Sequence, residues 1–220
     1  MKTLTVIPCA GKGERFLLAG YPQPKPLLPM ADGRTLLEWV IDYGQAAHLV
    51  TVAMEADEKA LSTAVRAANA WRPLTWSPIW LTERPNGPLD SVMAAKRLFR
   101  DEELIINYCD CFLYSGFGVF VQEMRNTPER QAGLVGFENY AERFTDVPSV
   151  PRFKAGGIFW FRKARDFVKH AQRLDLGDEV GIPQVVYHYP RWAVYNGTHG
   201  YRDLGVPEDY QRFMAEGARP

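Results

Sequence analysis

The sequence has few cysteines and no excess of charge of either sign. Three cysteines among 220 residues, an odd number, argue against a disulfide framework and fit a reducing compartment. Lysines plus arginines number 26, and so do aspartates plus glutamates. Because neither sign forms a long block, the composition gives no support to a nucleic-acid groove or a polybasic membrane patch. We therefore expect the partners to be small molecules and not nucleic acid.

Long apolar runs are also lacking. No uninterrupted stretch approaches the length of a membrane span, and the apolar stretch near the N-terminus ends at Pro8, too short for a signal peptide. We expect a cytoplasmic protein without a membrane partner. The sequence leaves open whether it forms a homo-oligomer.

Metal-binding spacing is absent from the cysteines and from the four histidines. Cys109-Asp110-Cys111 has no second cysteine pair, and no His-x-x-x-His occurs, so a tetrahedral zinc site cannot be completed. We predict instead that both cysteines pack in the core. Because side chains alternate along an extended segment, Cys109 and Cys111 are predicted to share one side and Asp110 the other, where it can face a ligand.

Apolar, β-branched runs alternate with amphipathic helical patterns along the chain. Strands are predicted at 3–8, 48–54, 78–82, 103–108, 133–137, 157–161 and 192–195. Helical stripes are formed by Leu61, Ala64, Val65 and Ala68, by Phe167, Val168, Ala171 and Leu174, and by Tyr210, Phe213 and Met214. This alternation predicts an α/β fold: a three-layer, Rossmann-like, mostly parallel sheet with helices on both faces, formed by residues 1–220 as one domain. Residues 139–152 are predicted to be loop.

The most informative segment lies within the first thirty residues. The strand 3–8 leads into Ala10-Gly11-Lys12-Gly13-Glu14-Arg15-Phe16, and Lys25 follows between two prolines. Glycines lack a Cβ, so the backbone can bring its N–H groups against phosphate oxygens, while Arg15 and Lys25 supply positive charge. In parallel sheets ligands bind beyond the carboxyl ends of the strands, which places this loop and Asp110 on the same edge. The segment therefore predicts a nucleoside triphosphate site.

Two common phosphate-binding motifs are excluded. Phe16 stands where the dinucleotide fingerprint has its third glycine, and no Gly-Lys-Ser/Thr of a P-loop occurs. Neither a NAD site nor a P-loop ATPase is indicated.

Four motifs follow one another along nearly the whole chain. They are Gly-x-Gly-x-Arg-Phe with Pro24-Lys25-Pro26-Leu27-Leu28; Asn107-Tyr108-Cys109-Asp110; Ala155-Gly156-Gly157-Ile158-Phe159-Trp160-Phe161; and Asp203-Leu204-Gly205-Val206-Pro207-Glu208-Asp209-Tyr210. Together they resemble the motifs of the sugar-phosphate nucleotidyltransferases (pyrophosphorylases), especially the branch serving capsular and surface polysaccharides. The resemblance implies an enzyme in which a sugar 1-phosphate, or a similar monoester, attacks the α-phosphorus of a nucleoside triphosphate and pyrophosphate leaves.

The resemblance also implies roles for individual residues. Arg15 and Lys25 are expected to be catalytic, because charge builds on the leaving pyrophosphate. Asp110 and Asp203 are expected to hold Mg²⁺, which prefers a few carboxylates together with phosphate oxygens and water. The expected nucleotide-binding residues are Ala10, Gly11, Lys12, Gly13, Gly87, Asp90 and Ser91.

Some of these residues also have a structural explanation. Asp90 and Ser91 open a helical pattern and are explained as well by an N-cap pair. Lys12 is nearly as well explained by a solvated lysine. Asp203 stands before Pro207, in a segment that also reads as an ordinary helix start.

The acceptor side departs most from the family pattern. Glu142, Lys154 and Gly157 are the expected substrate contacts, and Arg143 or Arg152 is an alternative to Lys154 for holding the acceptor phosphate. The sequence decides neither the sugar nor the nucleobase.

Two substitutions in the family motifs widen the choice of function. Val206 and Phe159 replace a threonine and a tyrosine of the family, so hydroxyl contacts expected of a hexose are lacking. A cytidylyltransferase acting on a polyol or sugar-alcohol phosphate is one alternative. A non-catalytic nucleotide-sugar sensor is another, although the presence of both Asp110 and Asp203 argues against it.

Overall fold

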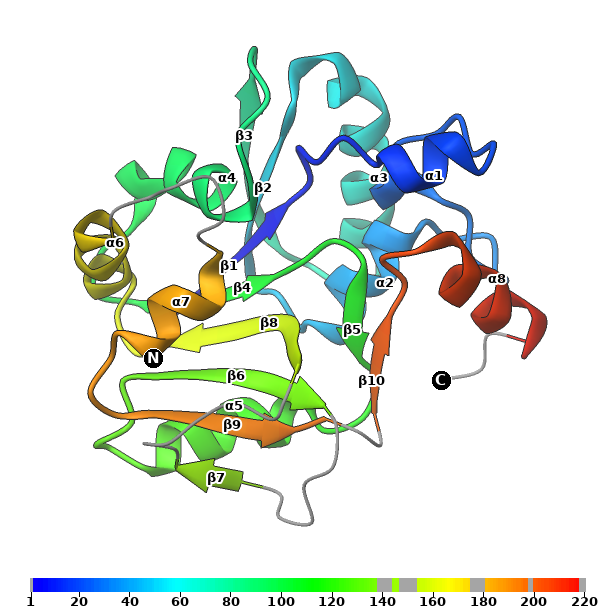
Figure 1. Cartoon of the computed structure of the whole chain (residues 1–220). Helices are drawn as coiled ribbons and strands as arrows, with labels where there is room; N and C mark the ends of the chain where they lie inside the picture. Colours follow the sequence, from blue (N-terminus) through cyan, green and yellow to red (C-terminus); the bar gives the residue numbers. More distant parts are fainter. Residues whose placement is uncertain (1, 138–143, 147–153, 175–180, 198–199, 218–220) are drawn as a thin grey trace.

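The computed structural model describes residues 2–137, 144–146, 154–174, 181–197 and 200–217. Within these residues the chain folds around one sheet of eight strands (Figure 1). Its strands are β1 (Thr3–Pro8), β2 (His48–Met54), β3 (Thr75–Leu81), β4 (Glu103–Asn107), β6 (Ala132–Phe137), β7 (Phe144–Asp146), β8 (Lys154–Phe161) and β9 (Trp192–Asn196). A separate antiparallel ribbon is formed by β5 (Cys111–Leu113) and β10 (Tyr201–Asp203).

The helices cover both faces of the sheet. They are α1 (Glu14–Leu18), α2 (Leu36–Tyr43), α3 (Glu58–Trp71), α4 (Pro88–Ala94), α5 (Phe117–Asn126), α6 (Ala164–Arg173), α7 (Ile182–Tyr187) and α8 (Pro207–Ala215). Short 3₁₀ helices occur at η1 (Lys25–Leu27), η2 (Glu55–Asp57) and η3 (Lys96–Leu98). None of the helices in the described ranges is long and apolar enough to cross a membrane.

The strand order is β3-β2-β1-β4-β8-β6-β9-β7. β3, β2, β1 and β4 pair in parallel, as do β6 and β9, whereas β8 and β7 run antiparallel to their neighbours. The prediction of a mostly parallel sheet is confirmed. Because β2 and β4 flank β1 on opposite sides, the direction of strand addition reverses at β1, and such a reversal opens a crevice beyond the carboxyl ends of the strands.

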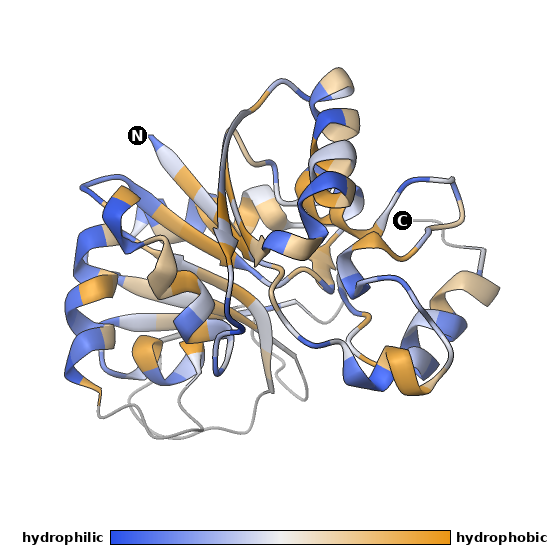
Figure 2. Ribbon diagram, turned by 90° about the horizontal axis from the view of Figure 1, so that it is seen from above, coloured by the Kyte–Doolittle hydropathy of each residue, from blue (hydrophilic) through white to orange (hydrophobic). Residues whose placement is uncertain are grey.

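Alternation of side chains along the strands produces two core layers. On β1, Leu4 and Val6 face a core that includes α4, α6 and α7, whereas Ile7 faces a core with α2, α3 and α8. α5 covers the second face farther along the sheet, where it packs on Ile105 and Trp160. Figure 2 shows hydrophobic strands lying between helices whose outer surfaces are largely hydrophilic. The predicted three-layer arrangement is confirmed.

Three strands of three residues each were not predicted. β5 and β10 are too short to show periodicity, and β7 lies within 139–152, the segment predicted to be loop. That prediction is wrong for 144–146, because these residues pair with β9. The other positions of 139–152 lie outside the described residues.

The cysteines are buried, as predicted, but they do not share one side. Cys109 packs in the core with α2, and Cys111 in the core with α5. The chain turns between them, because β4 ends at Asn107 and the amide of this side chain donates to the carbonyl oxygens of Tyr108 and Cys111, at 2.9 Å each. Strict alternation holds only where the backbone stays extended.

Candidate functional site

The glycine loop joins β1 to α1 at the carboxyl edge of the sheet. Gly13 caps α1 with φ 64° and ψ 23°, a left-handed conformation that glycine adopts without strain. Within the described residues, no backbone N–H group from Ala10 to Arg15 donates to an acceptor. Phe16 and Leu17 are the first to do so, both to the carbonyl oxygen of Gly13 at 2.9 and 3.1 Å. These six successive N–H groups are therefore available to an anion.

Lys25 lies at the start of η1 and forms an ion pair with Asp110, at the turn after β4. The two side chains are 21% and 14% exposed, so the pair is largely withdrawn from water. Burial lowers the pKa of Lys25, but Cys109 and Asp110 raise it by more, and the net direction is upward. The lysine is therefore charged at neutral pH. The structure joins two residues that the sequence predicted as separate parts of the site.

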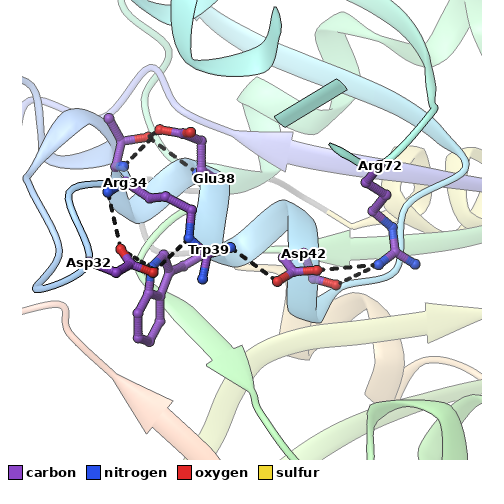
Figure 3. Close-up of polar contacts among 7 residues, drawn as sticks. Asp32, Arg34, Glu38, Trp39, Asp42 and Arg72 are labelled. Atoms are coloured by element: carbon purple, nitrogen blue, oxygen red, sulfur yellow. Dashed lines mark hydrogen bonds and ion pairs between the residues drawn. The ribbon is translucent and has the colours of Figure 1, made fainter. Parts of the chain in front are cut away.

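A polar network braces the segment between Lys25 and α2 (Figure 3). Asp32 accepts hydrogen bonds from Arg34 Nε (2.7 Å) and Trp39 Nε1 (3.0 Å), and Arg34 Nη1 reaches Asp42 on α2 (3.1 Å). A capping box starts α2, in which the N-cap threonine and the glutamate of the first turn exchange hydrogen bonds. These contacts tie the loop that carries Lys25 to a buried helix.

The β5–β10 ribbon brings Asp203 to Asp110. The Leu204 N–H donates to the carbonyl oxygen of Asp110 at 2.8 Å. A Cβ placed on Gly205 would lie 2.9 Å from Asp203 Oδ1 and 3.1 Å from Asp110 Oδ2, so both carboxylates border this glycine.

The charges around Gly205 suit a divalent cation. Desolvation raises the pKa of Asp203, the negative charge of Asp110 raises it further, and the Gly205 N–H (2.8 Å to Oδ1) opposes both. Among the residues that the structure describes, no group of three or more His, Cys, Asp or Glu side chains could by itself hold a metal ion. Two carboxylates alone fit an ion that takes its other ligands from phosphate and water.

Arg84, in the loop after β3, is a residue of the site that the sequence analysis did not predict. Its Nη1 donates to the carbonyl oxygens of Ala10 (3.2 Å) and Gly11 (3.1 Å), and so reaches the glycine loop from beyond β2. A single basic residue in a loop carries no local pattern from which such a contact could be predicted.

The loop that opens α4 is stabilised by its own residues. The N–H and the hydroxyl of Ser91 both donate to the Gly87 carbonyl oxygen, at 3.1 and 3.2 Å, and Asp90 Oδ2 accepts the Asn86 N–H at 3.2 Å. Both side chains therefore hold the loop in place. They are not the N-cap pair that the sequence allowed, because both lie inside α4, whose N-cap is Gly87, and no side chain caps the helix. A contact between this loop and a nucleobase stays a prediction.

Comparison with known families settles the membership of the chain. The profile of the MobA-like NTP transferase domain matches residues 5–129, more than half of the chain, including the glycine loop, Lys25 and Asp110. The chain belongs to the MobA-like NTP transferase family. No curated protein sequence matches it.

Solved structures share the fold of this NTP transferase over its whole length. A protein from Bacillus anthracis, assigned as a glucose-1-phosphate thymidylyltransferase and bound to sucrose, superposes with a TM-score of 0.81 at 13% identity, covering 100% of this chain and 96% of that one. A UDP-glucose pyrophosphorylase bound to UDP-glucose gives 0.79 at 13% identity, covering 99% of both chains. A UTP-bound UGPase from Acinetobacter baumannii gives 0.70 at 15% identity, covering 100% and 95%. At these identities the likeness shows the fold.

Arg15, a predicted site residue of the NTP transferase, and its neighbour Phe16 lie on α1 and differ in exposure. Arg15 is exposed beside the free N–H groups. Phe16 is buried and makes edge-to-face contacts with Tyr21 and Tyr210, which fasten α1 to α8. The aromatic residue that replaces the third glycine of the dinucleotide fingerprint thus has a packing role.

On the predicted acceptor side of the NTP transferase, two glycines of β8 make room for tyrosine rings. A Cβ on Gly157 would lie 2.6 Å from Tyr108 Cγ, and one on Gly156 would lie 2.7 Å from Tyr201 Cζ. Gly157 is therefore a packing residue beside the Asp110 turn, and any contact with substrate stays a prediction.

The other acceptor residues are only partly within the described ranges. Glu142, Arg143 and Arg152 lie outside them, as does the side chain of Lys154, whose backbone starts β8.

A cavity of about 520 Å³ lies at the opposite, amino edge of the sheet. Its walls come from the first residues of β1, β2 and β3 and from α5. None of the predicted site residues of this NTP transferase lines it.

Proposed function

We propose that this protein transfers a nucleoside monophosphate from a nucleoside triphosphate to a phosphorylated small molecule, a sugar 1-phosphate or a similar monoester, and releases pyrophosphate. The observation that carries the proposal is the run of six free N–H groups from Ala10 to Arg15, beside the Lys25–Asp110 pair at the same sheet edge. Membership of an NTP transferase family and the fold of enzymes that handle UTP and UDP-glucose support it.

In this reaction the chain acts by position and charge. The acceptor phosphate oxygen forms a bond to the α-phosphorus while the bond to the pyrophosphate oxygen breaks, and no covalent enzyme intermediate is required. The N–H groups of the glycine loop bind phosphate oxygens, and Arg15 offers its planar fork to the β- and γ-phosphates. Lys25, held by its ion pair with Asp110, supplies a fixed positive charge near the α-phosphate.

Asp110 and Asp203 are the residues that would hold Mg²⁺. They border the same glycine, and the pKa of Asp203 is raised in part by the charge of Asp110, a repulsion that a divalent cation relieves. When bound, the ion neutralises charge on the triphosphate oxygens.

A substrate screen tests the proposal. ATP, CTP, GTP, UTP and dTTP are each incubated with Mg²⁺ and a panel of sugar 1-phosphates and polyol phosphates, and pyrophosphate release is measured with a coupled enzyme assay. We expect release that requires one base and a phosphorylated acceptor. Turnover of CTP with a polyol phosphate alone would identify the cytidylyltransferase alternative. Triphosphate binding without turnover on any acceptor would refute the enzyme and favour the sensor.

A further inference from the structure

We infer that Arg84 is a positioning residue of the nucleotide site, which orients the donors of the glycine loop without itself binding phosphate. The inference rests on the proposed function, because it takes a triphosphate to be what these donors receive. Nothing in the family match or in the fold comparison assigns a role to this residue.

The geometry of the peptide unit carries the argument. One nitrogen, Arg84 Nη1, donates to the carbonyl oxygens of both Ala10 and Gly11, at 3.2 and 3.1 Å. Both carbonyls therefore point toward the guanidinium. In a planar trans peptide the N–H points opposite to the C=O of the preceding residue. The N–H groups of Gly11 and Lys12 consequently point away from Arg84, toward the other side of the loop.

This orientation has an energetic cost that Arg84 offsets. Successive carbonyls in an extended chain point to opposite sides, and turning two of them to one side brings their negative ends together. A charged donor between the two oxygens relieves that repulsion, and hydrogen bonds to charged groups are stronger than neutral ones. Without the guanidinium, rotation of either peptide unit would relieve the repulsion between the two carbonyls. That rotation would turn one N–H group away from the side that receives the anion.

The same contact joins two segments of the site. Arg84 precedes Gly87 by three residues, in the loop whose α4 end is predicted to face the nucleobase. By donating to Ala10 and Gly11, it fastens this loop to the phosphate-binding loop across the end of β2. The two loops are thereby placed relative to each other before a ligand arrives.

The test uses Arg84→Met, which keeps the aliphatic stem and removes the donors, Arg84→Lys, and the matched control Arg97→Met at an exposed arginine. Binding of inorganic tripolyphosphate with Mg²⁺ is measured by calorimetry. Tripolyphosphate has no nucleobase, so the measured affinity reports the phosphate contacts alone. The amide signals of Gly11 and Lys12 are followed by ¹H–¹⁵N NMR in the ligand-free proteins. Because Arg84 is exposed, all variants should fold, and thermal unfolding verifies this.

We expect Arg84→Met to weaken tripolyphosphate binding on the order of tenfold, the effect of losing a charged hydrogen bond. It should also shift the Gly11 and Lys12 amide signals without ligand. Arg84→Lys should recover part of the affinity, because an ammonium can donate to both carbonyls. Arg97→Met should match the wild type in both measurements.

Three results would overturn the inference while leaving the nucleotide site standing. Weaker binding with unchanged amide signals would make Arg84 a direct phosphate ligand, and shifted signals with normal binding would show that loop orientation is unimportant. An Arg84→Met protein equal to Arg97→Met would show no role. A wild-type protein that binds neither tripolyphosphate nor any nucleoside triphosphate would instead refute the nucleotide site, and the inference with it.

Discussion

Replacing Asp110 with asparagine should reduce stability and activity together. Asparagine keeps the shape of the side chain but leaves Lys25 as an uncompensated charge. Removing one partner costs about 3–5 kcal/mol in a fully buried ion pair and about 0–1 kcal/mol in an exposed one. The side chains here are 21% and 14% exposed, and the amide oxygen still accepts one hydrogen bond. We therefore expect an intermediate loss, about 2 kcal/mol in the free energy of unfolding.

Thermal unfolding measures this loss. In a chain of 220 residues, about 1 kcal/mol lowers Tm by about 2–4 °C, so Asp110→Asn should lower it by about 4–8 °C. The matched control is Asp101→Asn, because Asp101 pairs with Arg165 at 2.9 Å but the two side chains are 65% and 50% exposed. In Asp101→Asn the free energy of unfolding should fall by less than about 0.5 kcal/mol. A double variant, Lys25→Met with Asp110→Asn, should regain stability, since no unpaired charge is left.

Activity provides the second measurement. Asp110→Asn should lower kcat by about 100-fold or more at saturating Mg²⁺, because the amide no longer supplies negative charge to the cation. The double variant should remain inactive although it is more stable. If the Tm of Asp110→Asn lay within 1 °C of that of Asp101→Asn, the Lys25–Asp110 pair would be screened by water and would contribute as little as an exposed pair. Near-normal turnover in folded Asp110→Asn would refute the carboxylate's catalytic part.

Three further predictions concern the glycine loop, α1 and the amino edge of β2. Gly13→Val should lower the free energy of unfolding by about 1–2 kcal/mol, because a β-branched residue is strained at φ 64°, and should also lower the affinity for triphosphate. Lys12→Ala should weaken triphosphate binding, measured by calorimetry, only modestly. A larger effect of Lys12→Ala than of Gly13→Val would mean that the lysine, not the backbone, binds phosphate. Arg15→Lys should lower kcat by about 100-fold, since an ammonium does not replace a bidentate fork, and steady-state kinetics showing only a raised KM would contradict a transition-state role. Burial and the positive charge of Lys2 lower the pKa of His48 below its ordinary 6.5, so the folded state resists protonation and the free energy of unfolding should decline as pH falls below 6.5. Urea titrations should show a smaller decline for His48→Gln, and identical pH profiles would disprove the assignment.

The part of the fold that could be predicted was the part with long, regular patterns. β1 and β2 have the predicted bounds because each is a run rich in apolar and β-branched residues, and α3, α6 and α8 follow from stripes at helical spacing. β5 and β10, at three residues each, are defined by their pairing with each other, which no local pattern expresses. The expected alternation of Cys109 and Cys111 was wrong for a related reason, since hydrogen bonds from Asn107 stabilise a turn between them.

The candidate site divides in the same way. The glycine loop is contiguous, and its carboxyl-edge position follows from being at the end of a parallel strand. The contact of Lys25 with Asp110 joins residues 85 positions apart, and that of Arg84 with Ala10 joins residues 74 apart. Such contacts depend on the order of strands in the sheet. The resemblance to family motifs indicated that Lys25 and Asp110 belong to one site, but it gave no reason to select Arg84.

The two glycines of β8 have a consequence for how sequences of this kind can diverge. Gly156 seats the ring of Tyr201, two residues before Asp203, and Gly157 seats the ring of Tyr108, two residues before Asp110. A methyl group on either glycine would displace one ring and move one carboxylate relative to the other. In an alignment of relatives, an alanine at one of these positions should therefore coincide with a smaller residue at the matching tyrosine, so that each pair varies as a unit.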